Sequence, residues 1–172
     1  EHRADVEGEF EAVAGAAGSK FRNSGQTCIC ANRLLVQEGI HDAFVERLAE
    51  HVGGFRLGNG LDEQATHGPL IDDGAIEKVE SLVGDATGRG ARVVLGGGRS
   101  DLGPRFYQPT VLASVDPDMR MFSEEIFGPV APVIRFRDEA EAIRLANDTP
   151  HGLASYFYST DLSRISRVAR PA

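Results

Sequence analysis

The sequence predicts one α/β domain with a largely parallel β-sheet. Segments of strand character alternate with segments of helical periodicity, and helices are followed by glycines and then by a strand, as in α/β units. Neither an internal repeat nor a linker interrupts the 172 residues. With 41% hydrophobic and 26% charged residues, the composition is that of a globular domain able to bury a core, which excludes disordered and collagen-like sequence.

The first half of the chain alternates strand and helix. The pattern predicts, in order, a strand over 33–37, a helix over 41–52, a helix after the N-cap candidates Asp72 and Asp73, and a strand over 91–95. Gly53 and Gly54 are expected to end the first of these helices, and Gly88 and Gly90 the second. Apolar residues recur at helical spacing in both, at Phe44, Val45, Leu48 and Val52 and at Ile76, Val79, Leu82 and Val83.

The second half continues the alternation. Residues 96–104 are expected to form a loop, because their glycines lack the Lys-Ser/Thr of a phosphate-binding loop. Pro109 makes 107–115 at best an edge or interrupted strand. The remaining predictions are a strand over 130–136, a helix over 138–147 with Ala142, Ile143 and Ala146 facing inward, a strand over 154–158, and a helix from the N-cap Asp161 through Ala169.

Composition narrows the class of partner. A formal net charge of −8 argues against nucleic acid, since phosphate binding requires a basic surface. No run approaches the roughly 18 apolar residues of a membrane span, and nothing resembles a signal peptide. Two cysteines cannot form a disulfide framework. We therefore expect a cytoplasmic protein without a membrane or nucleic-acid partner.

Cys28 lies in a polar stretch just before the first predicted strand, among Asn23, Ser24, Gln26 and Thr27. A structural cysteine is usually buried among aliphatic side chains, so this setting raises the possibility of a reactive thiol, and the residues alone leave both interpretations open. Cys28 and Cys30 offer only two metal ligands, with no second cysteine pair following. No metal site is expected.

The segment Lys20–Arg33, KFRNSGQTCICANR, closely resembles the active-site segment of the aldehyde dehydrogenase superfamily, in which G-Q-x-C carries the nucleophile. Four further blocks resemble family motifs and occur in the family's order. They are G-P-L-I at Gly68–Ile71, F-Y-x-P-T-V at Phe106–Val111, E-x-F-G-P within Phe122–Val130, and A-N-x-T-x-x-G-L-A at Ala146–Ala154.

This resemblance implies the three-layer α/β fold of the family's catalytic domain and an NAD- or NADP-dependent oxidation of a small aldehyde. Cys28 matches the nucleophile, whose own backbone N–H is one donor to the oxyanion. Glu125 matches the glutamate that binds the nicotinamide ribose hydroxyls. Phe127 matches the aromatic residue near the nicotinamide, and an ordinary core phenylalanine remains the alternative.

The second cysteine and the arginines make the segment most similar to the succinate-semialdehyde dehydrogenase branch. Arg22 matches the arginine that binds the distal carboxylate of a dicarboxylic semialdehyde; a surface or interdomain ion pair is the alternative. Cys30 lies beyond the nucleophile position. It is a possible redox partner of Cys28, because a C-x-C disulfide would be strained and easily reduced.

The resemblance also implies what the sequence lacks. Residues 1–172 are expected to be a catalytic domain truncated at both ends. The N-terminal dinucleotide-binding domain, its oxyanion asparagine and the E-L-G-G general base are absent from the 172 residues, as is the oligomerising strand of the family. The full-length protein is expected to be a homo-oligomer, and the isolated chain to be inactive; an in-frame E-L-G-G upstream would support this.

Two other functions compete with an oxidoreductase. One is an inactive pseudoenzyme that survives as a binding or assembly module, although a decayed chain would be expected to lose Cys28 or Glu125. The other is a thiol hydrolase that pairs Cys28 with a histidine. No histidine falls in a family-like catalytic block.

Overall fold

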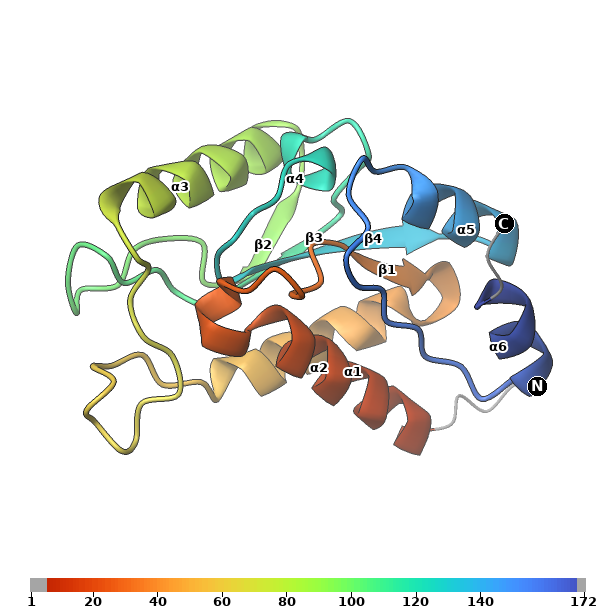
Figure 1. The fold of residues 1–172 in the computed structure, drawn as a ribbon, viewed down its shortest axis with the longest axis horizontal. Coiled ribbons are helices and arrows are strands. Elements are labelled where there is room, and N and C mark those ends of the chain that lie inside the picture. The colour runs from red at the N-terminus through yellow and green to blue at the C-terminus, as the bar shows by residue number, and fades with distance from the viewer. Residues whose placement is uncertain (1–5, 170–172) are drawn as a thin grey trace.

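The computed structural model describes residues 6–169, with the side chains of residues 11–169 (Figure 1). The helices are α1 (Val6–Lys20), α2 (His41–Gly53), α3 (Asp73–Gly88), α4 (Arg120–Ser123), α5 (Glu139–Asn147) and α6 (Leu162–Val168), with 3-10 turns η1 (Arg22–Gly25) and η2 (Glu38–Ile40). The strands are β1 (Leu34–Gln37), β2 (Arg92–Leu95), β3 (Thr110–Ala113) and β4 (Val130–Phe136). None of the described helices combines the length and apolarity needed to cross a membrane.

The strands form one sheet in the order β1-β4-β3-β2. β4 pairs in parallel with both β1 and β3, and only β2 runs antiparallel, against β3. The predicted α/β class with a largely parallel sheet is confirmed. The parallel pairing of β1 and β4 has a functional consequence, because the loops that precede these two strands emerge at the same edge of the sheet.

Of the two alternatives predicted for 107–115, the edge strand is wrong, whereas the strand is interrupted as expected: Tyr107 forms an isolated bridge and β3 begins only after Pro109. β3 lies between β4 and β2, and all four of its residues are buried. Pro109 precedes the strand by one residue, so its missing N–H falls outside the ladder. The first N–H of the strand, on Thr110, donates to the carbonyl of Pro129 at 2.8 Å.

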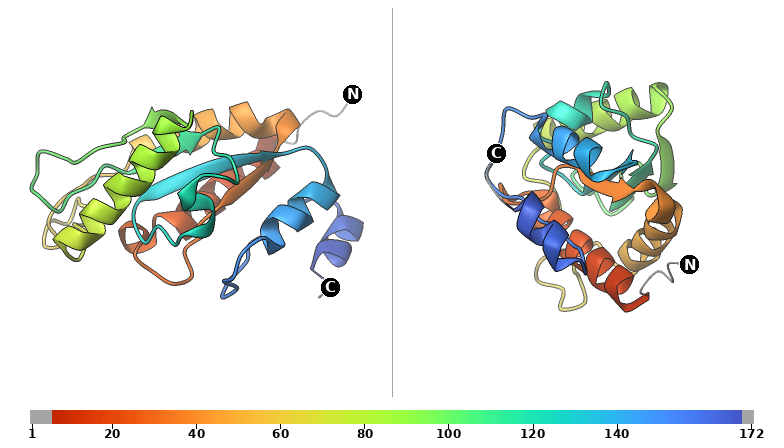
Figure 2. Two further views of the ribbon diagram at one scale, coloured as in Figure 1. Left: turned by 90° about the horizontal axis from the view of Figure 1, so that it is seen from above. Right: turned by 90° about the vertical axis from the view of Figure 1, so that its right-hand side faces the viewer.

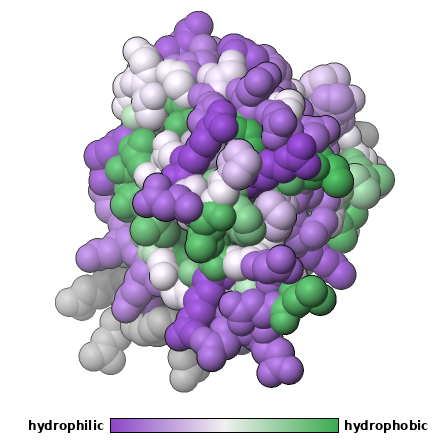
Figure 3. All heavy atoms as spheres, turned by 90° about the vertical axis from the view of Figure 1, so that its left-hand side faces the viewer, coloured by the Kyte–Doolittle hydropathy of each residue, from purple (hydrophilic) through white to green (hydrophobic). Residues whose placement is uncertain are grey.

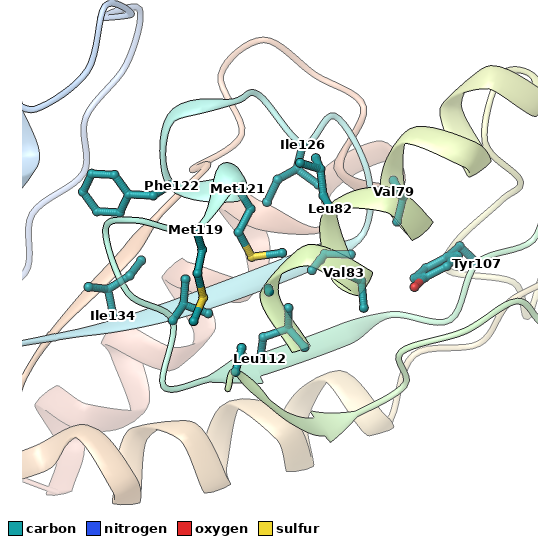
Figure 4. Close-up of a cluster of buried hydrophobic side chains, with 14 of the residues drawn as sticks. Val79, Leu82, Val83, Tyr107, Leu112, Met119, Met121, Phe122, Ile126 and Ile134 are labelled. Carbon is teal, nitrogen blue, oxygen red and sulfur yellow. The ribbon is translucent and has the colours of Figure 1, made fainter. Parts of the chain in front are cut away.

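Helices cover both faces of the sheet, giving the three layers visible in the right-hand view of Figure 2. Because side chains alternate along a strand, Val111 and Ala113 join the apolar cluster under α1 and α2, whereas Leu112 joins the cluster under α3. The second cluster, shown in Figure 4, is filled largely from α3 and the segment around α4. Its fully buried members include Val79, Leu82, Leu112, Met121 and Ile126.

The predicted helix caps are confirmed. Asp72 accepts a hydrogen bond from the Ala75 N–H at 2.8 Å, and Asp161 accepts from the N–H groups of Ser163 and Arg164. The predicted inward face of α5 is right at Ala142, which is half-buried, and wrong at Ile143 and Ala146, which are exposed. Leu145 is the buried residue of this helix and Ala146 is exposed, because α5 packs through the stripe formed by Ala142 and Leu145 three positions later.

The strand predicted over 154–158 is absent, and this segment pairs with none of the strands among the described residues. Two tyrosines instead hold this segment against the first part of the chain. The Tyr156 hydroxyl donates to the carbonyl of Ile29 at 3.0 Å, and the Tyr158 hydroxyl lies where a side chain on Gly15 of α1 would be.

Candidate active site

The chain passes from α1 to the Cys28 loop (residues 21–33) through a left-handed turn. Asn23, Ser24 and Gly25 have successive φ values of 52°, 56° and 75°. The first two cost roughly 1–2 kcal/mol each relative to right-handed backbone, and such strain is concentrated at functional sites. Reciprocal bonds between Asn23 and Gln26 close the turn.

The G-P-L-I block holds this loop in place. The Ser24 hydroxyl donates to the Gly68 carbonyl at 2.9 Å, and the Gln26 amide donates to the Pro69 carbonyl at 3.3 Å. The Gln26 side-chain oxygen also accepts from the Ile71 N–H at 2.9 Å. Two blocks that are more than 40 residues apart in sequence therefore form one rigid unit.

Cys28 is exposed on the surface of this unit. It occupies a turn closed by the Cys30 N–H, which donates to the Thr27 carbonyl at 3.0 Å. Within the described part of the chain, the Cys28 backbone N–H has no hydrogen-bond acceptor and is available to a ligand. Cys30 is half-buried, with its sulfur 2.9 Å from the Thr27 hydroxyl and 3.6 Å from the Arg22 carbonyl. Both thiols are free.

The E-x-F-G-P loop lies against the Cys28 loop. A Cβ atom on Gly25 would overlap the carbonyl of Gly128, so the two backbones are in direct contact there. These loops precede β1 and β4, which explains how segments about 100 residues apart meet. Glu125 is exposed and Phe127 is half-buried with φ at +50°, a strained value for a side chain of this size.

Arg22 is exposed in η1, and its guanidinium makes no ion pair with any residue that the structure describes. The structure therefore leaves this charge free for a ligand. It brings Arg22, Cys28, Cys30, Glu125 and Phe127 into two contacting loops.

Lys20 is a buried residue close to Cys30 and Glu125 that the sequence reasoning does not single out. This last residue of α1 is only 1% exposed. Burial lowers the pKa of its ammonium group to about 8, while the nearby charges of Cys30 and Glu125 oppose that shift.

His67 is hydrogen-bonded to Phe21, the first residue of the Cys28 loop. Its Nε2 donates to the Phe21 carbonyl at 3.0 Å, so its Nδ1 is the atom that accepts from the Thr66 hydroxyl, and its ring stacks on Phe55 at 4.3 Å. No imidazole within residues 6–169 is hydrogen-bonded to Cys28. The described residues therefore lack the pair that a histidine-activated thiol hydrolase requires.

We expect His67 to make the fold sensitive to acid. Burial lowers the pKa of His67 below its usual value of 6.5, although the bond to Phe21 opposes the shift. The unfolded chain then binds the proton more readily, so this contribution to stability is complete above pH 6.5 and is lost as the pH falls below it. Urea unfolding at pH 7.5 and 5.5 should show a smaller loss of stability for His67→Gln than for the parent chain. Equal losses in both proteins would contradict this role.

One hollow in the described surface lies away from the cysteines. It has a volume of about 550 Å³ and is lined by Phe55, Leu57, Leu95 and Leu102 among others, but by none of the candidate residues. Figure 3 shows the end of the molecule that carries the loops after α2 and β2, where apolar side chains are scattered among polar ones. The described residues contain no cluster of three or more potential metal ligands. The candidate site therefore consists of the Cys28 loop and the E-x-F-G-P loop.

The fold and the site together define an α/β domain that carries a candidate thiol active site. The chain belongs to the aldehyde dehydrogenase family, whose model matches residues 2–172. It is 54% identical over 158 residues to the NADP(+)-dependent succinate-semialdehyde dehydrogenase of Escherichia coli and to the glutarate-semialdehyde dehydrogenase of Pseudomonas aeruginosa, covering 92% of this chain and 33% of each relative. The crystal structure of succinate-semialdehyde dehydrogenase from Burkholderia pseudomallei superposes with a TM-score of 0.92 at 51% identity, over 96% of this chain and 34% of that one. The chain thus spans about a third of the length of the relatives it matches.

Proposed function

We propose that this chain is the nucleophile-bearing portion of the catalytic domain of an NAD(P)-dependent aldehyde dehydrogenase that oxidises a dicarboxylic semialdehyde, with succinate semialdehyde as the first candidate. The observation that carries the proposal is the contact between the Cys28 and E-x-F-G-P loops at Gly25 and Gly128. The contact supports the proposal because the loop that carries the exposed Cys28 thiol touches the loop that carries the exposed Glu125 carboxylate.

Cys28 performs the covalent step. As the thiolate, its sulfur adds to the aldehyde carbon and forms a thiohemiacetal, and its free N–H donates to the developing oxyanion. A bound NAD(P)+ would accept the hydride from that carbon, which leaves a thioester on Cys28. Water then hydrolyses the thioester to the carboxylic acid and restores the thiol. A sulfur nucleophile suits both halves of the reaction, because it adds readily to the aldehyde and because the resulting thioester hydrolyses more easily than an ester.

The donor set fits a nicotinamide nucleotide. Glu125 makes no hydrogen bond through its carboxylate to the described residues, so both oxygens are free to accept from the two adjacent ribose hydroxyls. Glu124 is not equivalent, because Arg120 holds both of its oxygens at 2.7 and 3.0 Å. Phe127 is half-buried in the same loop and would pack near the nicotinamide ring.

Arg22 would bind the distal carboxylate of the substrate. Its guanidinium is exposed, unpaired within the described chain and six residues before Cys28. A planar guanidinium takes a carboxylate through two parallel hydrogen bonds. The names of the two relatives above support this substrate class, since succinate and glutarate semialdehydes both carry a carboxylate at the end opposite the aldehyde.

The activity can be tested in a chimera in which this chain replaces the segment it matches in the E. coli relative, hereafter the chimera. We expect the chimera to reduce NADP+ with succinate semialdehyde, and the isolated 172-residue chain to produce no NADPH, because the proposed general base and cofactor domain lie in the rest of the chimera. A folded but inactive chimera would favour the pseudoenzyme interpretation. NADPH production by the isolated chain would overturn the expectation that it is inactive.

A further inference from the structure

Asn32, at the end of the Cys28 loop, is hydrogen-bonded to the E-x-F-G-P loop. Its side-chain oxygen accepts from the Ile126 N–H at 2.9 Å. Its side-chain NH2 group donates to the Glu124 carbonyl at 2.9 Å and to the Met121 carbonyl at 3.2 Å. These bonds join residues 89 to 94 positions apart in the sequence.

Two of these bonds are made to the peptide groups on either side of Glu125. The Glu124 carbonyl belongs to the peptide group before Glu125, and the Ile126 N–H belongs to the peptide group after it. One amide side chain therefore binds both peptide groups that flank the Glu125 Cα atom, as a neighbouring strand would. The backbone of Glu125 is fixed in this way, while its carboxylate remains exposed.

We propose that Asn32 is a positioning residue for Glu125, holding its backbone so that the carboxylate meets the ribose of the cofactor in a set orientation. This inference rests on the proposed function, in which Glu125 binds the nicotinamide ribose. An exposed glutamate on a free loop would lose conformational entropy on binding, and a backbone already fixed reduces that loss. The effect should therefore fall on cofactor binding and leave aldehyde binding unchanged.

Asn32→Leu and Asn32→Asp separate the parts of the interaction. Leucine has a similar size and removes all three bonds. Aspartate keeps an acceptor for the Ile126 N–H but turns an oxygen toward the carbonyls of Glu124 and Met121. In the chimera, we expect both to raise the KM for NADP+ by about three- to tenfold, the equivalent of one or two hydrogen bonds, with the KM for succinate semialdehyde unchanged.

The neighbouring Arg33 provides the matched control. It donates to the Leu145, Ala146 and Asp148 carbonyls at 2.8 to 3.0 Å, and so fastens the same loop end to α5 instead of to Glu125. Arg33→Gln should reduce thermal stability without changing the KM for NADP+. A rise in that KM equal to the rise for Asn32→Leu would mean that general loosening of the loop explains both.

Two further measurements keep the inference testable. In a Glu125→Gln background, Asn32→Leu should raise the KM for NADP+ less than about twofold, because coupled residues are non-additive. In the 172-residue chain, Asn32→Leu should speed hydrogen exchange of the Ile126 amide, and Asn32→Asp should leave it protected. An inactive parent chimera would count against the proposed function. If the parent chimera is active and Asn32→Leu leaves its KM for NADP+ unchanged, the proposed role of Asn32 is overturned. Unchanged hydrogen exchange of the Ile126 amide in Asn32→Leu would also overturn it.

Discussion

In the chimera, Cys28→Ala is expected to lower oxidation of succinate semialdehyde by at least about 10⁴-fold, because without the sulfur neither the thiohemiacetal nor the thioester can form. NADP+ binding should change little, since the proposed cofactor contacts come from Glu125 and Phe127. Steady-state kinetics followed by NADPH absorbance, together with fluorescence titration of NADP+, would measure both. Retention of more than about a hundredth of the parent activity would mean that Cys28 is not the nucleophile.

Cys30→Ala is the matched control, because it removes a thiol two residues away. In the parent chain the Cys30 sulfur is half-buried against the Thr27 hydroxyl and the Arg22 carbonyl. We therefore expect the Cys30→Ala variant to keep most of the activity. Iodoacetamide should modify Cys28 before Cys30 in the parent chain, as mass spectrometry can show, since Cys28 is the more exposed.

The same control tests the redox interpretation of Cys30. If hydrogen peroxide joins the two thiols in a reducible disulfide, the oxidant takes two electrons and two protons and becomes water. The parent chimera should then recover its activity on addition of a reductant, whereas Cys30→Ala should be oxidised irreversibly. Equal recovery of both proteins would rule out a protective disulfide between Cys28 and Cys30.

Gly25→Ala is expected to reduce the free energy of unfolding by about 3 kcal/mol, the sum of a left-handed alanine and of overpacking against a rigid backbone. Gly25 has φ at +75°, and a Cβ atom there would overlap the Gly128 carbonyl. The neighbouring loops can accept it only by separating. Urea unfolding of the chain measures the loss of stability, and the KM for NADP+ in the chimera should rise as well.

Gly18→Ala is the control, because it makes the same chemical change on the exposed face of α1. A Cβ atom on Gly18 meets nothing within 4 Å, and the helical backbone suits alanine. We expect a gain of about 0.5–1 kcal/mol in the free energy of unfolding. If Gly25→Ala were as stable as the parent, the contact between the two loops would not be tight.

The local sequence pattern is sufficient to predict most of the helices and strands. The helices α2, α3 and α6, the strands β1, β2 and β4 and the caps at Asp72 and Asp161 follow from periodicity and from side chains that satisfy free N–H groups. The sequence pattern does not predict the helix α1. Its segment is rich in alanine and glycine, which gives no clear apolar stripe, and its packing against α2 stabilises it.

The sequence by itself determined the alternation of helices and strands, the motifs around Cys28 and Glu125, and through them the family. Only the tertiary structure decided that β3 is internal, that 154–158 forms no strand, and that Lys20 is buried near Cys30 and Glu125. The same holds for the bonds of Asn32 around Glu125. The physical reason is distance along the chain. A cap or an apolar stripe depends on neighbours within a few residues, whereas burial and a bond across 90 residues depend on which strands pair.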